Sequence, residues 1–172
     1  MTALVHSFDP VASESARVLI LGSMPGKRSL AAAEYYAHPR NAFWKIMQEV
    51  AGIDCAASYQ QRLQALKARG IALWDVLHSC HREGSLDGAI ERGSVKVNDF
   101  DALFRHHPEI RVVLFNGETS ERYYKRYVLP GIQDRSIAHL RMPSTSPAHA
   151  AVPLEQKIEL WRVGMLSSVT ER

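Results

Sequence analysis

The sequence predicts an α/β fold with a mainly parallel sheet, and three observations favour this class. The chain has 172 residues, of which 46% are hydrophobic and 23% charged, the usual balance of a globular domain. No internal repeat, low-complexity segment or linker divides it, so we expect one domain over residues 1–172. Short β-type runs alternate with helical patterns, which is typical of a parallel sheet covered by helices.

The elements follow from the spacing of apolar residues. Continuous apolar runs of about five residues predict buried strands, and apolar residues three and four apart predict helices. Ser58 and Gln61 form a capping-box pattern, and Gly52 and Gly70 are helix-ending glycines. The expected order is strand 17–21, helix 40–50, a helix from Ser58 to Gly70, strand 71–77, a short helix capped by Asn98 and ending near 106, strand 111–115, helix 118–128, strand 137–142, loop 143–153 and a last helix from 153 or 154.

Charge and cysteine content restrict the class of protein. The 21 basic and 18 acidic residues give a net charge of +3, which permits an anionic partner without requiring one. Cys55 and Cys80 are too few for an all-cysteine zinc or iron–sulfur site and fit a reducing compartment. No apolar run is long enough to cross a membrane, and the first residues lack a signal-peptide pattern. We therefore expect a cytoplasmic protein without a membrane partner.

The loops that follow the predicted strands indicate where a ligand would bind. In open parallel sheets, ligands bind beyond the carboxyl ends of the strands. We therefore expect four segments to face one crevice, namely Gly22-Ser-Met-Pro25, Trp74-Asp75, Phe115-Asn-Gly117 and Met142-Pro-Ser144.

Several side chains near these loops have two interpretations from chemistry alone. Tyr36 could stack on a nucleobase or belong to the core, and Asn41 could hold a water or a base edge, or cap the following helix. Asp75 ends an apolar strand, where a carboxylate must be paired or functional, and Asn116-Gly is also an ordinary turn dipeptide. The group His78-Ser-Cys-His81 matches no standard zinc spacing, so no metal site is expected.

Four ordered motifs resemble the uracil-DNA glycosylase superfamily, most of all its hypoxanthine-DNA (deoxyinosine) glycosylase branch. Mismatch-specific uracil-DNA glycosylases share a similar His-Pro-x-Asn-x-Phe-Trp run and final helix. The motifs are Leu21-Gly-Ser-Met-Pro-Gly26; the run Tyr35-Tyr-Ala-His-Pro-Arg-Asn-Ala-Phe-Trp44, which is the most specific; Leu73-Trp-Asp-Val-Leu77 with Phe115-Asn-Gly117; and Pro143-Ser-Thr-Ser-Pro-Ala-His-Ala150.

The resemblance implies a three-layer α/β/α sandwich around a four-stranded parallel sheet. It also implies a monofunctional repair enzyme that acts as a monomer on double-stranded DNA containing a deaminated base. Such an enzyme hydrolyses the N-glycosidic bond of a flipped base, here hypoxanthine, and leaves an abasic site without a metal or other cofactor.

The resemblance also assigns roles to individual residues. Asn41 is the expected catalytic residue, and Tyr36 is the aromatic that stacks on the extruded base. The expected base-binding residues are Gly22, Ser23, Met24, Tyr36, Asp75, Asn116 and Ser144, and the expected DNA-binding residues are Arg40, Ser146, Pro147, Ala148 and His149. The last of these segments matches the loop that fills the gap in the duplex, although it lacks a large apolar wedge.

Base selection can be argued from hydrogen-bonding edges. Met24 stands where many superfamily members have a water-activating Asn or Asp, and a thioether cannot polarise water. Asp75 as a carboxylate could accept from N1–H of hypoxanthine, while Asn116 could donate to O6. Adenine has an acceptor at N1 and would face an unpaired carboxylate, which disfavours it.

Three alternatives remain open from the sequence. A uracil or thymine mismatch glycosylase would use the same chemistry on another base. A non-catalytic lesion-binding protein would bind DNA without cleavage. An unrelated α/β enzyme would cleave free nucleosides and ignore DNA.

Overall fold

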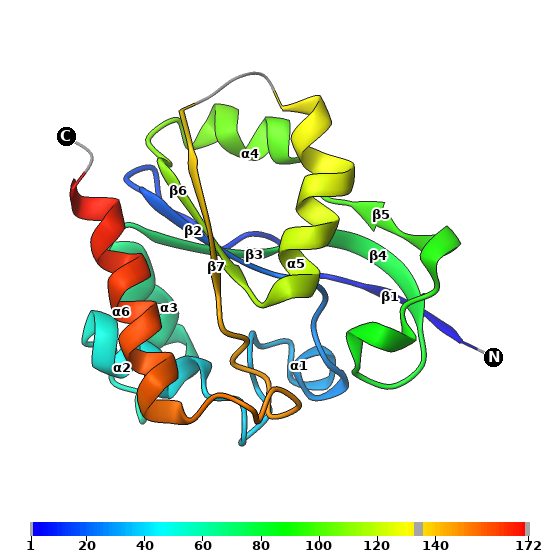
Figure 1. The fold of residues 1–172 in the computed structure, drawn as a ribbon, viewed down its shortest axis with the longest axis horizontal. Helices are drawn as coiled ribbons and strands as arrows, with labels where there is room; N and C mark the ends of the chain where they lie inside the picture. Colours follow the sequence, from blue (N-terminus) through cyan, green and yellow to red (C-terminus); the bar gives the residue numbers. More distant parts are fainter. Residues whose placement is uncertain (1, 133–135, 171–172) are drawn as a thin grey trace.

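The computed structural model, which describes residues 2–132 and 136–170, has a central sheet of four parallel strands (Figure 1). The strand order is β3-β2-β6-β7. Each neighbouring pair is parallel, and this parallel pairing is what the sequence predicts. The strands are β2 (Val18–Gly22), β3 (Ile71–Asp75), β6 (Val112–Asn116) and β7 (Ala138–Met142).

Helices cover both faces of this sheet and complete the expected three-layer sandwich (Figure 1). One layer contains α2 (Phe43–Ala51), α3 (Tyr59–Ala68) and α6 (Leu154–Thr170). The opposite layer contains α4 (Phe100–His106) and α5 (Glu118–Tyr123), which continues as a π-helical turn over Tyr124–Val128.

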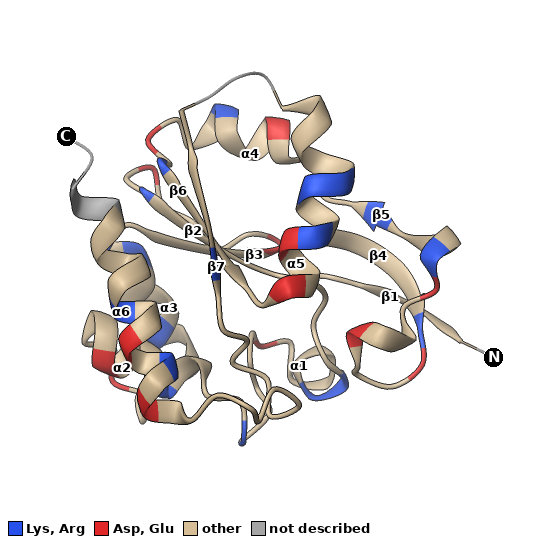
Figure 2. Cartoon of the chain, viewed as in Figure 1, with Lys and Arg blue, Asp and Glu red and all other residues tan. Residues whose placement is uncertain are grey.

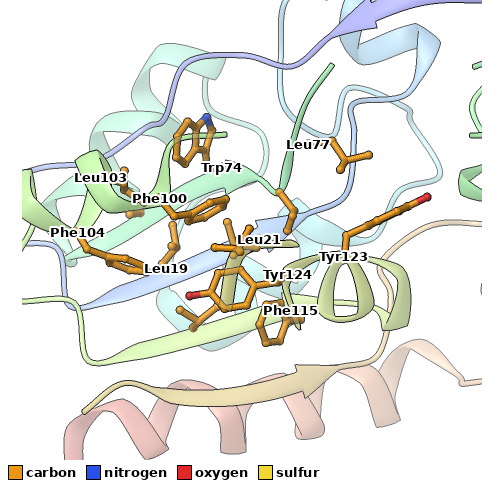
Figure 3. Close-up of a cluster of buried hydrophobic side chains, with 14 of the residues drawn as sticks. Leu19, Leu21, Trp74, Leu77, Phe100, Leu103, Phe104, Phe115, Tyr123 and Tyr124 are labelled. Carbon is orange, nitrogen blue, oxygen red and sulfur yellow. The ribbon is translucent and has the colours of Figure 1, made fainter. Parts of the chain in front are cut away.

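The two apolar layers follow from the alternation of side chains along each strand. On β2, Leu19 and Leu21 pack with α4 and α5 around Phe100 and Tyr124, the cluster drawn in Figure 3. Ile20 faces the other way, toward α2, α3 and α6. Because every residue of β2 is buried, a continuous apolar run rather than an alternating one marks this strand.

The structure also contains a second, antiparallel sheet of order β1-β4-β5, which the sequence does not predict. It consists of β1 (Ala3–His6), β4 (Leu77–Arg82) and β5 (Lys96–Val97). The predicted strand 71–77 is therefore two strands that separate at Val76. The polar residues in β4 conceal it, because His78 is exposed while its neighbours Leu77 and Ser79 are buried.

Short helices occupy loops in which the sequence predicted no helix. The helix α1 (Lys27–Ala32) follows the first loop. The remaining elements are 3-10 turns at Asp87–Ala89, Arg92–Ser94 and Leu129–Gly131. The predicted helix 40–50 begins only at Phe43.

Helix capping agrees with the sequence at α3 and differs at α4. Ser58 and Gln61 form the predicted capping box. The predicted Asn98 cap is wrong, because the side chain of Asp99 accepts from the N–H of Ala102 and caps α4. Buried Asn98 instead donates from Nδ2 to the carbonyl oxygens of Asp75 (2.8 Å) and Leu77 (3.2 Å), where β3 passes into β4. Among the described helices, none has the length and apolar character needed to cross a membrane.

Candidate active site

The carboxyl ends of the four parallel strands lie side by side, as the sequence predicts. Gly22 pairs in register with Asp75, and Asn116 pairs with Met142. The segments after these residues therefore leave the sheet at one edge, where the loop 143–153 also lies (Figure 1).

Gly22 allows a close approach of two functional groups. A Cβ atom at this position would lie 2.4 Å from Oδ1 of Asp75 and 3.2 Å from the hydroxyl of Tyr36. The first distance is far inside van der Waals contact, so no side chain fits here without displacing the carboxyl group. Gly22 thus lets the Asp75 carboxyl and the Tyr36 hydroxyl meet over the end of β2.

Asp75 is buried and forms no ion pair with any residue that the structure describes. The residue is 4% exposed, and its Oδ2 has no hydrogen-bond partner within the described part of the chain. Burial, and secondarily the Asp87 carboxylate, raise the pKa of Asp75 to about 8, although the Arg82 guanidinium opposes the shift. The Asp75 side chain is therefore mainly a neutral acid at pH 7, which corrects the expectation of a carboxylate.

Tyr36 has a defined orientation and one occupied ring face. Its backbone is in the left-handed region at φ 55°, and its ring stacks on Phe43 with centroids 4.1 Å apart. The hydroxyl accepts from Nδ2 of Asn116 at 3.0 Å. Burial, followed by the nearby Asp75, raises the pKa of Tyr36, so the phenol stays protonated. A flipped base could therefore stack only on the ring face opposite Phe43.

Both amide hydrogens of Asn116 are engaged with other residues of the protein. Its Nδ2 donates to Tyr36 and, at 2.9 Å, to Oγ1 of Thr145, while its Oδ1 accepts from the N–H of Thr145 at 2.9 Å. The expected donation from Asn116 to O6 of a base is inconsistent with this arrangement, because both amide hydrogens are already used. Asn116 instead holds Tyr36 and the loop after β7 in place.

Asn41 lies immediately before α2, close to the same loop. Its Oδ1 accepts from the N–H of Phe43 at 3.0 Å, so the side chain does bind the start of the helix. The next residue, Ala42, donates its N–H to the carbonyl oxygen of Thr145 at 3.0 Å. An amide oxygen accepts two hydrogen bonds, so the Phe43 contact leaves Oδ1 able to accept a second one. Arg40, one residue earlier, is exposed.

The loop 143–153 is braced by its own hydroxyl groups and by α6. Ser144 Oγ accepts from the N–H of Ser146, and Ser146 Oγ accepts from the N–H of Ala148. The buried ammonium of Lys157 on α6 donates to the carbonyl oxygen of His149 at 2.7 Å. The expected DNA-binding residues at the tip of this loop, Pro147, Ala148 and His149, are all exposed.

The first loop has buried polar support that sequence reasoning missed. Ser23 donates its hydroxyl to Asp87 Oδ1 at 2.7 Å. The guanidinium of Arg82, which is only 2% exposed, donates to the carbonyl oxygens of Met24 and Pro25. The Met24 side chain belongs to the apolar core on the α4–α5 face of the sheet. Position 24 therefore supplies packing at this site.

The missed residues are Thr145, Arg82, Asp87 and Asn98. Thr145 stands within the motif Pro143-Ser-Thr-Ser146, which gave a local signal. The other three lie in residues 77–99, whose β structure the sequence did not reveal. Within residues 2–132 and 136–170, no three His, Cys, Asp or Glu side chains gather as metal ligands would.

Comparison with known families gives a match over most of the chain. The family model of the uracil DNA glycosylase superfamily matches residues 10–163. A protein from Methanosarcina barkeri named hypoxanthine DNA glycosylase is 42% identical over 119 residues, which cover 69% of this chain and 74% of that protein. A protein of the same name from Methanosarcina acetivorans is 36% identical over 134 residues, which cover 73% and 84%.

A solved structure is similar over nearly the whole chain. The solution NMR structure of a Methanosarcina acetivorans protein, described as a candidate uracil DNA glycosylase, superposes with a TM-score of 0.77 at 29% sequence identity. The similarity covers 95% of this chain and 99% of that one.

Proposed function

Because this chain belongs to the uracil DNA glycosylase superfamily, we propose that it is a DNA glycosylase that releases hypoxanthine from deoxyinosine in double-stranded DNA. The observation that supports this substrate is the name shared by two relatives, hypoxanthine DNA glycosylase, at 42% and 36% identity over most of the chain. The product is an abasic site, and the chain acts as a monofunctional monomer.

The target nucleotide must leave the duplex before the reaction, because a stacked base cannot reach an active site. The hydroxyl-braced loop 143–153 and Arg40 would hold the DNA beside the carboxyl edge of the sheet. The exposed Ala148 and His149 are the candidates to fill the vacated space in the duplex. Asp75 is almost completely buried, so the base would have to displace the contacts that cover it.

Asn41 is the proposed catalytic residue, through the orientation of the attacking water. Its Oδ1 is already fixed by the Phe43 N–H and can accept one hydrogen from a water molecule. An amide is too weak a base to ionise the water early. This arrangement suits a dissociative reaction, in which the glycosidic bond stretches first and water attacks late.

Asp75 in its neutral form complements the edge of hypoxanthine. Its O–H can donate to O6 while its carbonyl oxygen accepts from N1–H. The carboxyl group of Asp75 thus makes both hydrogen bonds, including the bond to O6 that the sequence analysis assigns to Asn116. A neutral carboxyl could also pair with adenine, by accepting from N6–H and donating to N1. Discrimination against adenine should therefore improve as pH rises above about 8 and the carboxylate forms.

The test is single-turnover cleavage of duplexes carrying one deoxyinosine or one deoxyuridine, followed by alkali to reveal abasic sites. The wild-type protein should release hypoxanthine, and Asn41→Ala should lower the rate by at least about a hundredfold. Gln60→Ala, which removes an exposed amide on α3, is the matched control and should leave the rate unchanged. Thermal unfolding of Asn41→Ala separates loss of the helix contact from loss of catalysis.

The remaining outcomes would replace the proposal. Uracil release alone would indicate a mismatch-uracil enzyme. The structural relative is described as a candidate uracil DNA glycosylase. Binding of the deoxyinosine duplex without an abasic product would indicate a lesion-binding protein. Cleavage of free deoxyinosine with no effect of DNA would indicate a nucleosidase. An Asp75→Asn protein with unchanged base preference would contradict the role of Asp75.

A further inference from the structure

A basic hollow lies beside the candidate active site and has no part in the chemistry proposed above. It has a volume of about 390 Å³ and opens between α5, its π-helical continuation and β7. Its lining has four cationic and two acidic side chains: Arg122, Lys125, Arg126 and Arg141, with Glu118 and Glu121. Figure 2 shows blue, basic segments on the helix labelled α5 and on β7.

Two of the four cations are held by one carboxylate. Glu121 bonds to Lys125 Nζ at 2.7 Å and also to Nε of Arg141. The side chains of Lys125 and Arg141 remain about half exposed, while the Glu121 side chain is 11% exposed. Glu121 therefore fixes the position of both cations while their other donors can still reach solvent.

The other two cations have no carboxylate at ion-pair distance in the described part of the chain, although Arg122 acts at longer range on Asp87. Among the described residues, neither Arg122 nor Arg126 forms an ion pair. Their guanidinium carbons instead lie 5.7 Å from the ring of Tyr123 and 5.1 Å from the ring of Tyr127. Because cation–π contacts orient a guanidinium without using its N–H donors, both arginines can bind an anion.

The hollow also lies along the path that a bound duplex would take. Helix α5 begins just after Asn116, and β7 ends just before the loop 143–153, so both lead away from the active-site edge. At about 1.5 Å per helical residue, Arg122 in α5 and Arg126 in its π-helical continuation lie roughly 9 and 15 Å from Asn116 along the helix axis. Phosphates flanking a flipped nucleotide fall within such distances, since duplex DNA rises about 3.4 Å per base pair on each strand.

We propose that this hollow binds backbone phosphates of the DNA strand that flanks the flipped nucleotide, chiefly through Arg122 and Arg126. The site reads no sequence; it adds affinity and fixes the position of the duplex on the protein. This inference rests on the proposed function for its ligand, double-stranded DNA. It does not depend on which base is released.

The test compares the salt dependence of duplex binding by fluorescence anisotropy, with and without a deoxyinosine. Each lost phosphate contact should make the slope of log K against log salt less steep by about 0.9, so Arg122→Gln/Arg126→Gln should reduce the slope by about 1 to 2. Arg122→Lys/Arg126→Lys keeps both charges and should retain the wild-type slope within about half a unit.

The matched control is Arg17→Gln/Arg105→Gln. It removes the same charge from exposed positions at the opposite, amino edge of the sheet, just before β2 and within α4. This control should leave the slope unchanged. An unchanged slope in Arg122→Gln/Arg126→Gln, or an equal change in the control, would overturn the inference.

The dependence of the cleavage rate on protein concentration separates this inference from the proposed function. Because it binds the duplex less tightly, Arg122→Gln/Arg126→Gln should need a higher protein concentration than the wild type to reach half of its maximal single-turnover rate on deoxyinosine duplexes. If the wild-type protein releases no base but the variant still changes the binding slope, the phosphate site holds and the proposed function fails. If the slope is unchanged while the wild type releases hypoxanthine, the proposed function holds and the phosphate site fails.

Discussion

Asp75 concentrates the unusual chemistry of the site in a single carboxyl group. It ends an apolar strand, contacts the Cα side of Gly22 and has an Oδ2 without a partner among the described residues. Two charged groups act on the pKa of Asp75: the Asp87 carboxylate raises it and the Arg82 guanidinium lowers it. The phenol groups of Tyr35 and Tyr36 also lie close to Asp75. Burial outweighs the cation, so the neutral acid is the stable form at pH 7.

The raised pKa of Asp75 makes folding stability depend on pH. An acid whose pKa is 3.8 when unfolded and about 8 when folded contributes stability that is complete below about pH 4 and is lost as pH rises toward 8. The free energy of unfolding should therefore fall by up to about 1.4 kcal/mol per pH unit in this window.

The Asp75→Asn variant is the control for this pH dependence of the free energy of unfolding. The amide is neutral at every pH, so the difference between wild type and Asp75→Asn should shift steadily in favour of Asn between pH 4 and 8. Urea denaturation at one-unit pH steps measures it. Parallel stability curves for the two proteins would show that Asp75 is ionised in the native state and would refute the assignment.

Among the elements, the junction of β6, α2 and the loop 143–153 depends on Thr145. This residue is 1% exposed, exchanges two hydrogen bonds with Asn116 and accepts a third from the Ala42 N–H. Through Asn116 the same junction sets the position of the Tyr36 hydroxyl. One buried residue, through its backbone and its hydroxyl group, thus aligns the Tyr36 ring, the start of α2 beside Asn41 and the loop 143–153.

Thr145→Val should show the importance of this junction. Valine keeps the shape but removes the acceptor for Asn116 Nδ2, and an unpaired buried donor costs about 1–3 kcal/mol. We expect that loss in urea denaturation together with a slower single-turnover rate, because Tyr36 is less well fixed. Thr145→Ser retains the hydroxyl and should recover most of both. A Val variant with wild-type stability and rate would show that the hydroxyl contributes nothing.

The molecule as a whole consists of two sheets that meet beneath the first loop. Arg82, the last residue of β4, extends its guanidinium from the antiparallel sheet to the carbonyl oxygens of Met24 and Pro25, which follow the parallel strand β2. It also supplies the positive charge near Asp75 and Asp87. The second sheet therefore supports the active-site loop.

Replacement of Arg82 should destabilise the whole fold. Arg82→Met leaves the carbonyl oxygens of Met24 and Pro25 without their donor and removes a positive charge near Asp87, and each buried polar group left unpaired costs about 1–3 kcal/mol. Arg92→Met, an exposed arginine in the same part of the chain, should cost less than about 0.5 kcal/mol. Thermal and urea denaturation of both variants test this, and equal stabilities would show that Arg82 does not hold the loop.

The parallel sheet and its helices could be predicted because their signals are local. The apolar runs of β2, β3 and β6 are buried on both faces, and the capping box at Ser58 uses residues three apart. The antiparallel sheet could not be predicted, because β4 carries two histidines and an arginine that only their tertiary neighbours allow to be buried or paired. The sequence also predicts Asn98 as the cap of α4, whereas Asp99 is the cap. Asn98 is held instead by carbonyl oxygens of Asp75 and Leu77, which are distant in the chain.

By itself, the sequence determined the α/β class, the meeting of the four strand-end loops at one edge of the sheet and the residues in those loops. These depend on periodicity and on the rule that parallel strands end together. Only the tertiary structure decided the chemical state of those residues. Asp75 is neutral because of its burial beside Asp87, and Asn116 is unavailable to a base because Tyr36 and Thr145 use both its hydrogens. Ionisation and hydrogen-bond capacity depend on neighbours distant in the chain, which no local pattern reveals.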